Sequence, residues 1–84
     1  TKVDVAELTQ ELFTKAVALA ERDWQLDAMA KGQIIVDRQR ITEAVMNLAQ
    51  NATQHTAKSD TIAIGSVIAK GKVRFWVRDT GEGI

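Results

Sequence analysis

The chain has 84 residues, 45% of them apolar and 26% charged, and its 11 acidic side chains balance 11 Lys and Arg. This length fits a single domain, and a formal net charge of zero excludes a broad electrostatic footprint for nucleic acid. Cysteine is absent, which excludes disulfides, thiolate nucleophiles and zinc–thiolate sites. No apolar run is long enough to span a bilayer, so we expect a cytoplasmic module, with any membrane anchor in a larger parent protein.

The first segment predicts a short strand followed by a long helix. Residues 1–5 (TKVDV) alternate polar and apolar side chains, which is typical of a short edge strand. Asp4 suits the N-cap of a helix over residues 5–22, because Glu7 follows three residues later as the acid of a capping box. Apolar residues recur at helical spacing along this segment and no glycine or proline interrupts it, so we expect an amphipathic helix.

Four further segments are predicted to be strands. Residues 24–29 (WQLDAM) alternate strictly between apolar and polar side chains, and residues 33–36 (QIIV) indicate a second, more deeply apolar strand. Residues 61–69 are rich in Ile and Val, and residues 72–78 (KVRFWVR) again alternate. The Lys-Gly pair between these last two segments predicts a tight hairpin turn.

The central feature of the sequence is a second predicted helix over residues 41–56 (ITEAVMNLAQNATQHT). Its apolar stripe is expected to consist of Ile41, Val45, Leu48 and Ala52. Asn47 and Asn51 lie one turn apart at the edge of this stripe, and Gln54 and His55 extend the same line. An amide at the border of a core needs hydrogen-bond partners, which side chains, backbone or a ligand with its metal ion can supply.

The order strand, helix, strand, strand, helix, strand, strand predicts an α/β fold. We expect a two-layer α/β sandwich, a mixed β-sheet with both helices packed on one face. Asp37 precedes the second helix as its N-cap. In the last strand, Phe75 and its alternate neighbours are expected to face the helices, which leaves Trp76 on the outer face. The acids Asp23 and Asp27 show no metal-ligand spacing and are interpreted as turn and strand residues.

The chain ends in Asp79-Thr80-Gly81-Glu82-Gly83-Ile84, directly after the last predicted strand. Glycines at alternate positions allow positive φ and let the backbone approach a flat ligand closely. A carboxylate fixed at the strand end can accept a hydrogen bond from an exocyclic amine, an arrangement that suits adenine. Taken alone, the same six residues are equally an ordinary turn.

The segment NLAQNATQHT, followed after a hairpin by DTGEGI, resembles the N box and G1 box of the sensor histidine kinase ATP-binding domain. The order of elements also resembles that domain, whose Bergerat fold is shared with gyrase, Hsp90 and MutL in the GHKL superfamily. The resemblance implies one partial domain over residues 1–84, with the N box at about 41–56 and the G1 box at 79–84.

The resemblance also implies a set of residues that bind ATP and Mg²⁺. Asn51 matches the family's magnesium ligand, and an amide carbonyl is a hard ligand suited to that ion. Asn47 matches the position one turn earlier, near the phosphates, and Asp79 matches the acid that binds the adenine amino group. The adenine pocket would be completed by Gly81, Gly83 and Ile84.

Two departures from the family pattern qualify this expectation. Where the family often has Lys or Arg followed by Tyr, this chain has Gln54 and His55, so phosphate affinity is expected to be weaker unless His55 contacts the nucleotide. The family's mobile lid, second glycine box and last strand and helix do not follow within these 84 residues. We therefore expect the fragment alone to be inactive, and we assign no catalytic residue within it.

The resulting hypothesis is the ATP-binding catalytic domain of a two-component sensor histidine kinase. Its partners would be its own phosphoacceptor and dimerisation domain and, through that domain, a response regulator. The alternatives are a non-catalytic interaction module with a degenerate pocket, an anti-sigma serine kinase, or a hydrolytic ATPase of the same fold. Hydrolysis is disfavoured because Asn47 stands where hydrolysing relatives have a glutamate base, and an amide cannot accept that proton. An unpaired sheet edge predicts self-association of the fragment.

Overall fold

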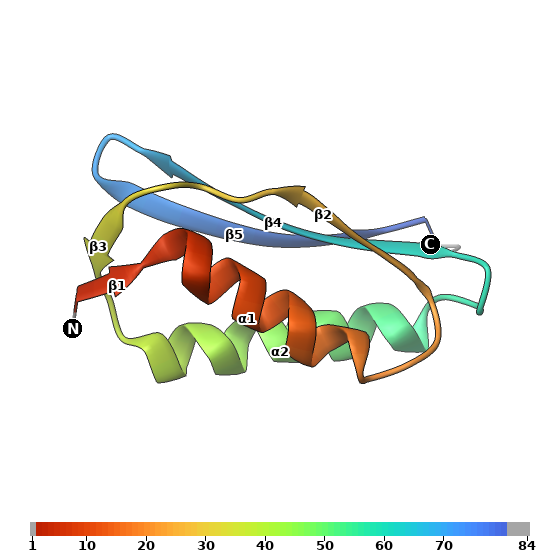
Figure 1. The fold of residues 1–84 in the computed structure, drawn as a ribbon. Helices are drawn as coiled ribbons and strands as arrows, with labels where there is room; N and C mark the ends of the chain where they lie inside the picture. The colour runs from red at the N-terminus through yellow and green to blue at the C-terminus, as the bar shows by residue number, and fades with distance from the viewer. Residues whose placement is uncertain (1, 81–84) are drawn as a thin grey trace.

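Two helices cover one face of a three-stranded sheet in the computed structural model, which describes residues 2–80 (Figure 1). This arrangement confirms the predicted two-layer α/β sandwich. In chain order the elements are β1 (Lys2–Asp4), α1 (Val5–Val17), β2 (Asp23–Ala28), β3 (Gln33–Ile35), α2 (Arg38–Gln54), β4 (Thr61–Ala69) and β5 (Lys72–Asp79). None of the helices in the described part of the chain is long and apolar enough to cross a membrane.

The central strand of the sheet is β4, which runs parallel to β2 and antiparallel to β5. The sheet is therefore mixed, as predicted. The β4–β5 ladder is continuous from Ile62 opposite Asp79 to Ala69 opposite Lys72. Its connecting residues, Lys70 and Gly71, have φ of 53° and 75°, and positive φ at both central positions is what a two-residue hairpin turn requires.

β1 and β3 form a separate two-stranded antiparallel sheet rather than extending the first one. The strand predicted at residues 33–36 is present as β3, and Val36 after it packs against the core, but β3 itself is less buried than its apolar sequence suggests. Only Ile34 of β3 is half-buried, whereas Ile35 is 77% exposed. Because β3 pairs only with the short β1, its second face has no layer to pack against within the described residues.

The first helix begins where the sequence predicted and ends earlier. The Asp4 side chain accepts a hydrogen bond from the backbone N–H of Glu7 at 3.2 Å, which satisfies one free donor of the first turn. The helix was predicted to reach Arg22 but ends at Val17. The Trp24 indole N–H donates to the carbonyl of Ala20 at 2.9 Å, so the segment after Val17 folds back toward the sheet instead of continuing the helix.

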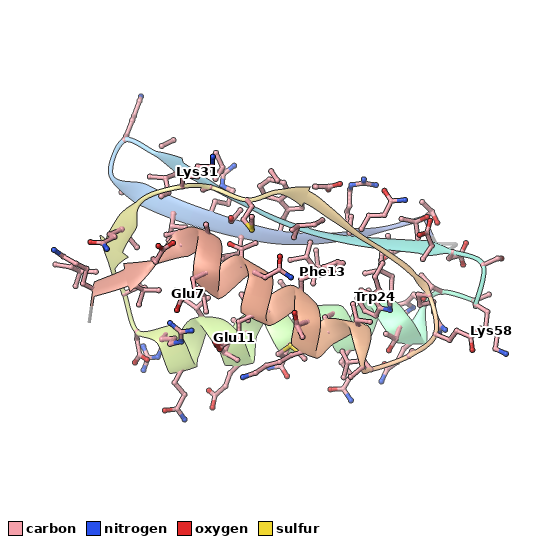
Figure 2. The ribbon with its side chains drawn as sticks, viewed as in Figure 1. Glu7, Glu11, Phe13, Trp24, Lys31 and Lys58 are labelled. Carbon is pink, nitrogen blue, oxygen red and sulfur yellow. The ribbon has the colours of Figure 1, made fainter. Side chains whose placement is uncertain are left out.

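The core between helices and sheet consists of two adjoining clusters of buried side chains. The first contains Val3, Leu8, Leu12 and Val45, and the second contains Ala16, Ala49 and Ile64. Val77 of β5 packs against both clusters, and Figure 2 shows Phe13 and Trp24 in the layer between α1 and the sheet. Leu8 is fully buried, so its replacement by Ala is expected to cost about 2–5 kcal/mol.

One polar contact crosses this core. Thr9 of α1 and Ser66 of β4 are both buried, and their hydroxyl oxygens lie 2.7 Å apart. Ser66 also accepts a hydrogen bond from the backbone N–H of Ala30 at 3.0 Å, and Thr9 donates to the carbonyl of Val5 at 2.6 Å. The bridge therefore joins α1, β4 and the segment after β2 without leaving a buried hydroxyl unsatisfied.

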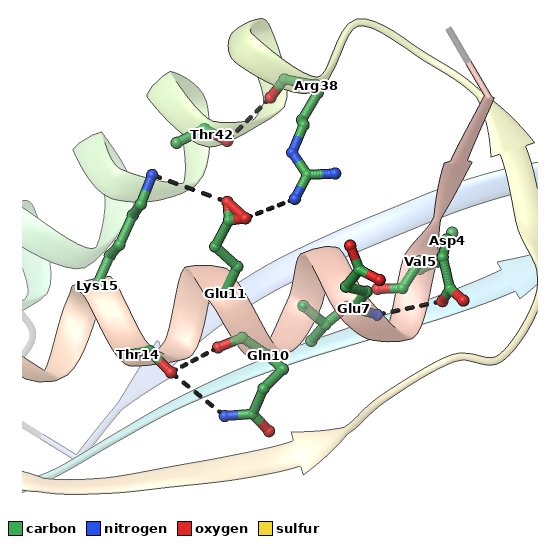
Figure 3. A network of polar contacts seen from close by, with 10 residues as sticks. Asp4, Val5, Glu7, Gln10, Glu11, Thr14, Lys15, Arg38 and Thr42 are labelled. Atoms are coloured by element: carbon green, nitrogen blue, oxygen red, sulfur yellow. Dashed lines mark hydrogen bonds and ion pairs between the residues drawn. The ribbon is translucent and has the colours of Figure 1, made fainter.

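The two helices are joined on their outer side by an exposed ion-pair network (Figure 3). Glu11 of α1 accepts a hydrogen bond from the guanidinium of Arg38, the first residue of α2, and its carboxylate lies 3.9 Å from Lys15. The Arg38 contact, more than Lys15, holds the pKa of Glu11 below its usual range. Because these side chains are well exposed, the network orients the helices more than it stabilises them.

The outer face of the sheet carries Trp76, as predicted, within a network that crosses all three strands. The Arg78 guanidinium makes two hydrogen bonds to the Asp27 carboxylate, at 2.6 and 2.7 Å, and the Trp76 indole N–H makes a third at 3.1 Å. These donors lower the pKa of Asp27, Arg78 more than Trp76, and the carboxylate in turn raises the pKa of Arg78. The Trp76 ring lies directly over Gly65, where an added Cβ would be 2.3 Å from a ring carbon.

Candidate functional site

The four predicted polar residues of the second helix all lie on exposed positions of α2. Asp37 caps α2 as predicted, because its carboxylate accepts a hydrogen bond from the backbone N–H of Arg40 at 3.2 Å. The buried face of α2 consists of Val45, Ala49 and Ala52. Helical periodicity turns the remaining positions outward, so the exposed residues include Asn47, Asn51, Gln54 and His55.

The buried stripe of α2 differs from the prediction at one position, since Val45 and Ala52 are buried as predicted and Ile41 packs against the first core cluster. Leu48 was expected in the stripe, but it is 48% exposed, and its neighbour Ala49 is fully buried. A small side chain at position 49 allows close approach to Ala16 and Ile64 in the second core cluster. Leu48 is thereby left beside Asn47 and Asn51 on the outward side of the helix.

Asp79, at the end of β5, lies on the side of the sheet that faces the helices. Side chains alternate between the two faces along a strand, so Asp79 shares its face with Val77, which packs against the cluster that contains Ala49. Figure 1 shows that α2 and β5 finish at the same end of the molecule. Asp79 makes contacts of its own there. The end of β5 and the end of α2 are thus brought together.

An open hollow of about 530 Å³ lies where these two ends meet. Its lining combines the end of α2, the following loop and the residue after β5, namely Gln54, His55, Thr56, Ala57, Ser59, Asp60 and Thr80. The hollow thus joins the end of the N-box segment to the second residue of the DTGEGI segment. Asn47, Asn51 and Asp79 are not among its described lining residues, and Asn51 lies one helical turn before His55 on α2.

The start of the DTGEGI segment is fixed to β4 by hydrogen bonds. The Thr80 backbone N–H donates to the carbonyl of Thr61 at 3.1 Å, and the Thr61 N–H donates to the Thr80 hydroxyl oxygen at 3.0 Å. The Thr80 hydroxyl lies 3.3 Å from one carboxylate oxygen of Asp60, whose other oxygen accepts from the N–H of Ala57 at 2.8 Å. Asp60 therefore ties the loop after α2 to Thr80.

The lining of this hollow offers neutral hydrogen-bond donors to a ligand. Its volume falls in the usual range of about 300–1,000 Å³ for ligand sites, and its hydroxyl and amide groups are suitable donors to phosphate oxygens. Among residues 2–80 no three acidic or histidine side chains come close enough to hold a metal ion by themselves. A divalent ion here would therefore depend on an amide carbonyl such as Asn51 together with oxygens of the ligand.

The described lining contains one carboxylate, Asp60, and neither Lys nor Arg. Lys58, beside the hollow in sequence, is instead directed to Glu21, with 3.8 Å between the charged atoms. Gln54 is expected to stand where the family often has a phosphate-binding cation. No Lys or Arg among the described lining residues takes its place. The predicted pocket residues Gly81, Gly83 and Ile84 lie outside the described residues.

A second hollow, of about 600 Å³, lies at the opposite end of the sheet. It is formed at the β4–β5 hairpin by Val67, Ala69, Lys70, Lys72, Val73 and Arg74. None of the residues that the two motifs single out belongs to this lining. Although it is the larger of the two, it contains no residue of either motif, whereas the first hollow contains Gln54, His55 and Thr80.

Arg22 is the residue at this site that sequence reasoning missed. It was expected as the last residue of the first helix, yet it lies in the turn before β2 and its guanidinium contacts the end of α2. Its partners, Thr53 and Thr56, are more than thirty positions away in sequence, with separations of 31 and 34 residues. No local pattern signals a contact of this kind.

No protein-family model and no curated protein matches the sequence. Solved structures do match. A nucleotide-free form of the catalytic domain of the histidine kinase ThkA aligns with a TM-score of 0.80 and 28% identity, over 100% of this chain and 60% of that domain. ThkA in complex with the response regulator protein TrrA gives the same TM-score and identity over 26% of that chain.

A mycobacterial sensor histidine kinase, MprB, aligns with a TM-score of 0.79 over 100% of this chain and 56% of its own length. At 20% identity this second likeness concerns the fold alone. The chain thus spans about 60% of the ThkA catalytic domain, and all of its described elements have counterparts in the shared fold.

Proposed function

We propose that this chain, which has the fold of a histidine kinase catalytic domain, binds Mg-ATP for phosphoryl transfer to a histidine on a separate dimerisation domain. The structural likeness to ThkA confirms the resemblance that the two sequence motifs predicted. The observation that carries the proposal is the shared hollow, in which Gln54 and His55 of α2 meet Thr80 of the DTGEGI segment. Residues 1–84 would then be one partial catalytic domain of a longer kinase.

In this proposal α2 provides the phosphate side of the site. Asn51 would hold the magnesium ion through its amide oxygen, and Asn47, one turn earlier, would lie near the phosphates. Gln54 and His55 would border the nucleotide where the helix ends. The ion supplies positive charge that offsets the charge of the phosphate oxygens, and the helix contributes fixed positions for its ligands.

The end of β5 provides the base side of the site. Asp79 lies on the helix-facing side of the sheet, at the end where α2 also terminates. Its carboxylate would accept a hydrogen bond from the adenine amino group, which guanine lacks at that position. The pocket for the base would be completed by Gly81, Gly83 and Ile84.

The position of Asn47 favours transfer to a protein group over hydrolysis. A hydrolytic relative needs a carboxylate base to activate water, and an amide has no basic form near neutral pH. Glu43 is exposed on α2 and lies two turns before Asn51, too far along the helix to take that role. The acceptor would be a histidine on the kinase's own dimerisation domain, in the cytoplasm, and a response regulator would receive the phosphoryl group afterwards.

One observation favours a second candidate function, a non-catalytic interaction module. The hollow contains no Lys or Arg among its described lining residues, and Gln54 stands where the family often has a cation. If phosphate affinity were lost, the fold would remain as a surface for protein contacts. The two candidates differ in whether the full-length protein binds nucleotide.

Calorimetric titration of the full-length protein with a non-hydrolysable ATP analogue and magnesium tests the proposal. We expect magnesium-dependent binding that Asn51→Ala weakens by about tenfold or more, because hydrogen bonds and ligands to charged groups are worth about 1.5–3 kcal/mol. Asp79→Asn is expected to reduce the preference for ATP over GTP. Gln39→Ala, an exposed amide at the opposite end of α2, is the matched control and should bind normally.

The two candidate functions give opposite results in this titration. Absence of heat and of thermal stabilisation at millimolar nucleotide would contradict nucleotide binding and favour the interaction module. Binding followed by release of free phosphate without labelling of a protein histidine would contradict the kinase assignment while retaining the nucleotide site.

A further inference from the structure

The end of α2 is held by a single guanidinium from outside the helix. Arg22 donates from Nε to the Thr56 hydroxyl oxygen at 2.7 Å. A terminal nitrogen of the same group donates to the carbonyl of Thr53 at 2.8 Å and to the carbonyl of Thr56 at 3.1 Å. Its other terminal nitrogen donates to the carbonyl of Glu21 at 2.7 Å, which fixes the guanidinium to its own turn.

These contacts act on the last turn of α2 and the residues just after it, where the carbonyl of Ala52 already accepts from the His55 N–H and the Thr56 hydroxyl. The last carbonyls of a helix lack N–H donors from a following turn, and a cation there also offsets the negative end of the helix dipole. Thr53 and Thr56 flank the two residues that border the hollow, Gln54 and His55. Because one guanidinium holds the chain on both sides of this pair, it fixes the backbone that carries both side chains.

The next residue in sequence holds the opposite wall of the same hollow. The Asp23 backbone N–H donates to the carbonyl of Asp60 at 3.0 Å. The Asp23 carboxylate accepts a hydrogen bond from the Thr61 hydroxyl at 3.0 Å. Thr61 is hydrogen bonded through its backbone to Thr80, so the Asp23 contacts extend to the start of the DTGEGI segment.

We infer that Arg22 and Asp23 are positioning residues for nucleotide binding, which set the end of the N-box helix at a fixed distance from the DTGEGI segment. The inference rests on the proposed function and deepens it. Neither residue belongs to the lining of the hollow, so neither needs to touch the nucleotide. They act through Thr53 and Thr56 on one wall and through Thr61 on the other.

The effect of these residues on nucleotide affinity depends on the fraction of molecules in which the end of α2 is correctly placed for binding. If the last turn of α2 loosens, only a fraction of molecules has Gln54 and His55 in place, and the apparent dissociation constant rises in inverse proportion to that fraction. A cap that merely stabilised the fold would lower the melting temperature and leave affinity unchanged in the molecules that remain folded. The two roles are therefore separable by measuring affinity and stability on the same variants.

The test compares the dissociation constant for Mg-ADP in the full-length protein across Arg22→Gln, Arg22→Lys and Asp23→Asn, at a temperature where each variant is folded. Arg22→Gln is expected to weaken binding by about tenfold, and Arg22→Lys to restore part of the loss, since an ammonium keeps the charge but not the planar fork. Asp23→Asn, which keeps the backbone bond to Asp60, should have the smaller effect. Amide exchange at residues 53–56 should accelerate in proportion to the lost affinity.

The matched control is Arg78→Lys, which weakens a guanidinium clamp of similar geometry on the outer face of the sheet. It should leave Mg-ADP affinity unchanged. Wild-type affinity in both Arg22 variants, with only a lower melting temperature, would overturn the positioning role and leave the proposed function intact. If Arg22→Gln fails to fold, Arg22→Lys decides between the same two results. A wild-type protein that binds no Mg-ADP would overturn the proposed function, and this inference with it.

Discussion

Arg22 and Arg78 each donate several hydrogen bonds through the guanidinium, but their acceptors differ. Arg22 binds backbone carbonyls at the end of α2, beside the candidate site. Arg78 binds the Asp27 carboxylate on the outer face of the sheet, the face opposite to the helices and to Asp79. Carbonyl oxygens do not titrate, whereas the carboxylate does, so only the second contact depends on pH. The Arg22 contact thus positions main chain beside the candidate site, whereas the Arg78 contact orients side chains on the outer face of the sheet.

Around the two arginine contacts, the largest expected effect on stability lies beside Arg78, at Gly65. An added Cβ there would lie 2.3 Å from the Trp76 ring, which Arg78 and Asp27 help to hold in place. Replacing Gly65 by Ala is therefore expected to destabilise the protein by about 1–3 kcal/mol, as overpacking does. Urea unfolding measures this loss, and Mg-ADP affinity should not change.

The cause of that loss can be isolated with a double variant. If the Trp76 ring is the obstacle, Gly65→Ala combined with Trp76→Leu should lose less stability than the sum of the two single losses. Strictly additive losses would show that the ring and the glycine do not interact in the way the geometry indicates.

The second effect concerns the hydrogen bond between the Thr9 and Ser66 hydroxyls inside the core. Like the Arg22 contact, it involves no titrating acceptor. Ser66→Ala removes the partner of both the Thr9 hydroxyl and the Ala30 N–H, although Thr9 keeps its bond to the carbonyl of Val5. We expect a loss of about 1–3 kcal/mol that is the same at pH 5 and pH 7. Ser59→Ala, in the exposed loop after α2, is the control and should have little effect on the urea midpoint.

The third effect depends on pH and concerns Asp27, the acceptor of the Arg78 contact. Hydrogen bonds from Arg78, and then from Trp76, lower the pKa of this carboxyl from its usual value of 3.8. Since the folded state holds the proton less tightly than the unfolded chain, the contribution of Asp27 to stability is complete above about pH 3.8 and is lost as the pH falls through the lower folded pKa. The stability difference between wild type and Asp27→Asn should therefore shrink on acidification.

The Arg22 contact provides the control for this experiment. The stability difference between wild type and Arg22→Gln is expected to persist over the same pH range, because its acceptors are carbonyls and a hydroxyl. If the stability losses of Asp27→Asn and Arg22→Gln changed with pH in the same way, the distinction between the Arg78 and Arg22 contacts would be contradicted.

The smallest effect is expected at Glu11, whose partners Arg38 and Lys15 are well exposed. Glu11→Gln should barely move the urea midpoint in physiological salt, because exposed ion pairs are screened and retain side-chain freedom. A large loss on this substitution would mean that the network between the helices contributes more to stability than its exposure indicates.

Local sequence signals predicted most of the fold correctly. The caps at Asp4 and Asp37, both ends of β4 and the hairpin turn all depend on residues close together in sequence. The errors arose where distant contacts decide the outcome. The first helix ends before Ala20, whose carbonyl accepts from the Trp24 indole, and β3 is exposed because among the described strands it pairs with the short β1 alone.

The candidate site was predictable to the extent that its residues belong to recognisable motifs. Asn51, Gln54 and Asp79 could be singled out because amides, glycines and an acid recur at a spacing typical of one family. Arg22 and Asp60 could not, because they act through backbone groups that many sequences would provide equally well. The residues that hold a site together are thus less visible in a sequence than those that face its ligand.

The most direct test of the account is a nuclear magnetic resonance titration of the full-length protein with Mg-ADP. We expect chemical shift changes at Gln54, His55 and Thr80, around the hollow that joins the two motif segments. Lys70 and Arg74, in the larger hollow at the β4–β5 hairpin, should not respond. Changes confined to that hairpin, or no changes at millimolar Mg-ADP, would contradict the claim that the end of α2 and the DTGEGI segment form a nucleotide site.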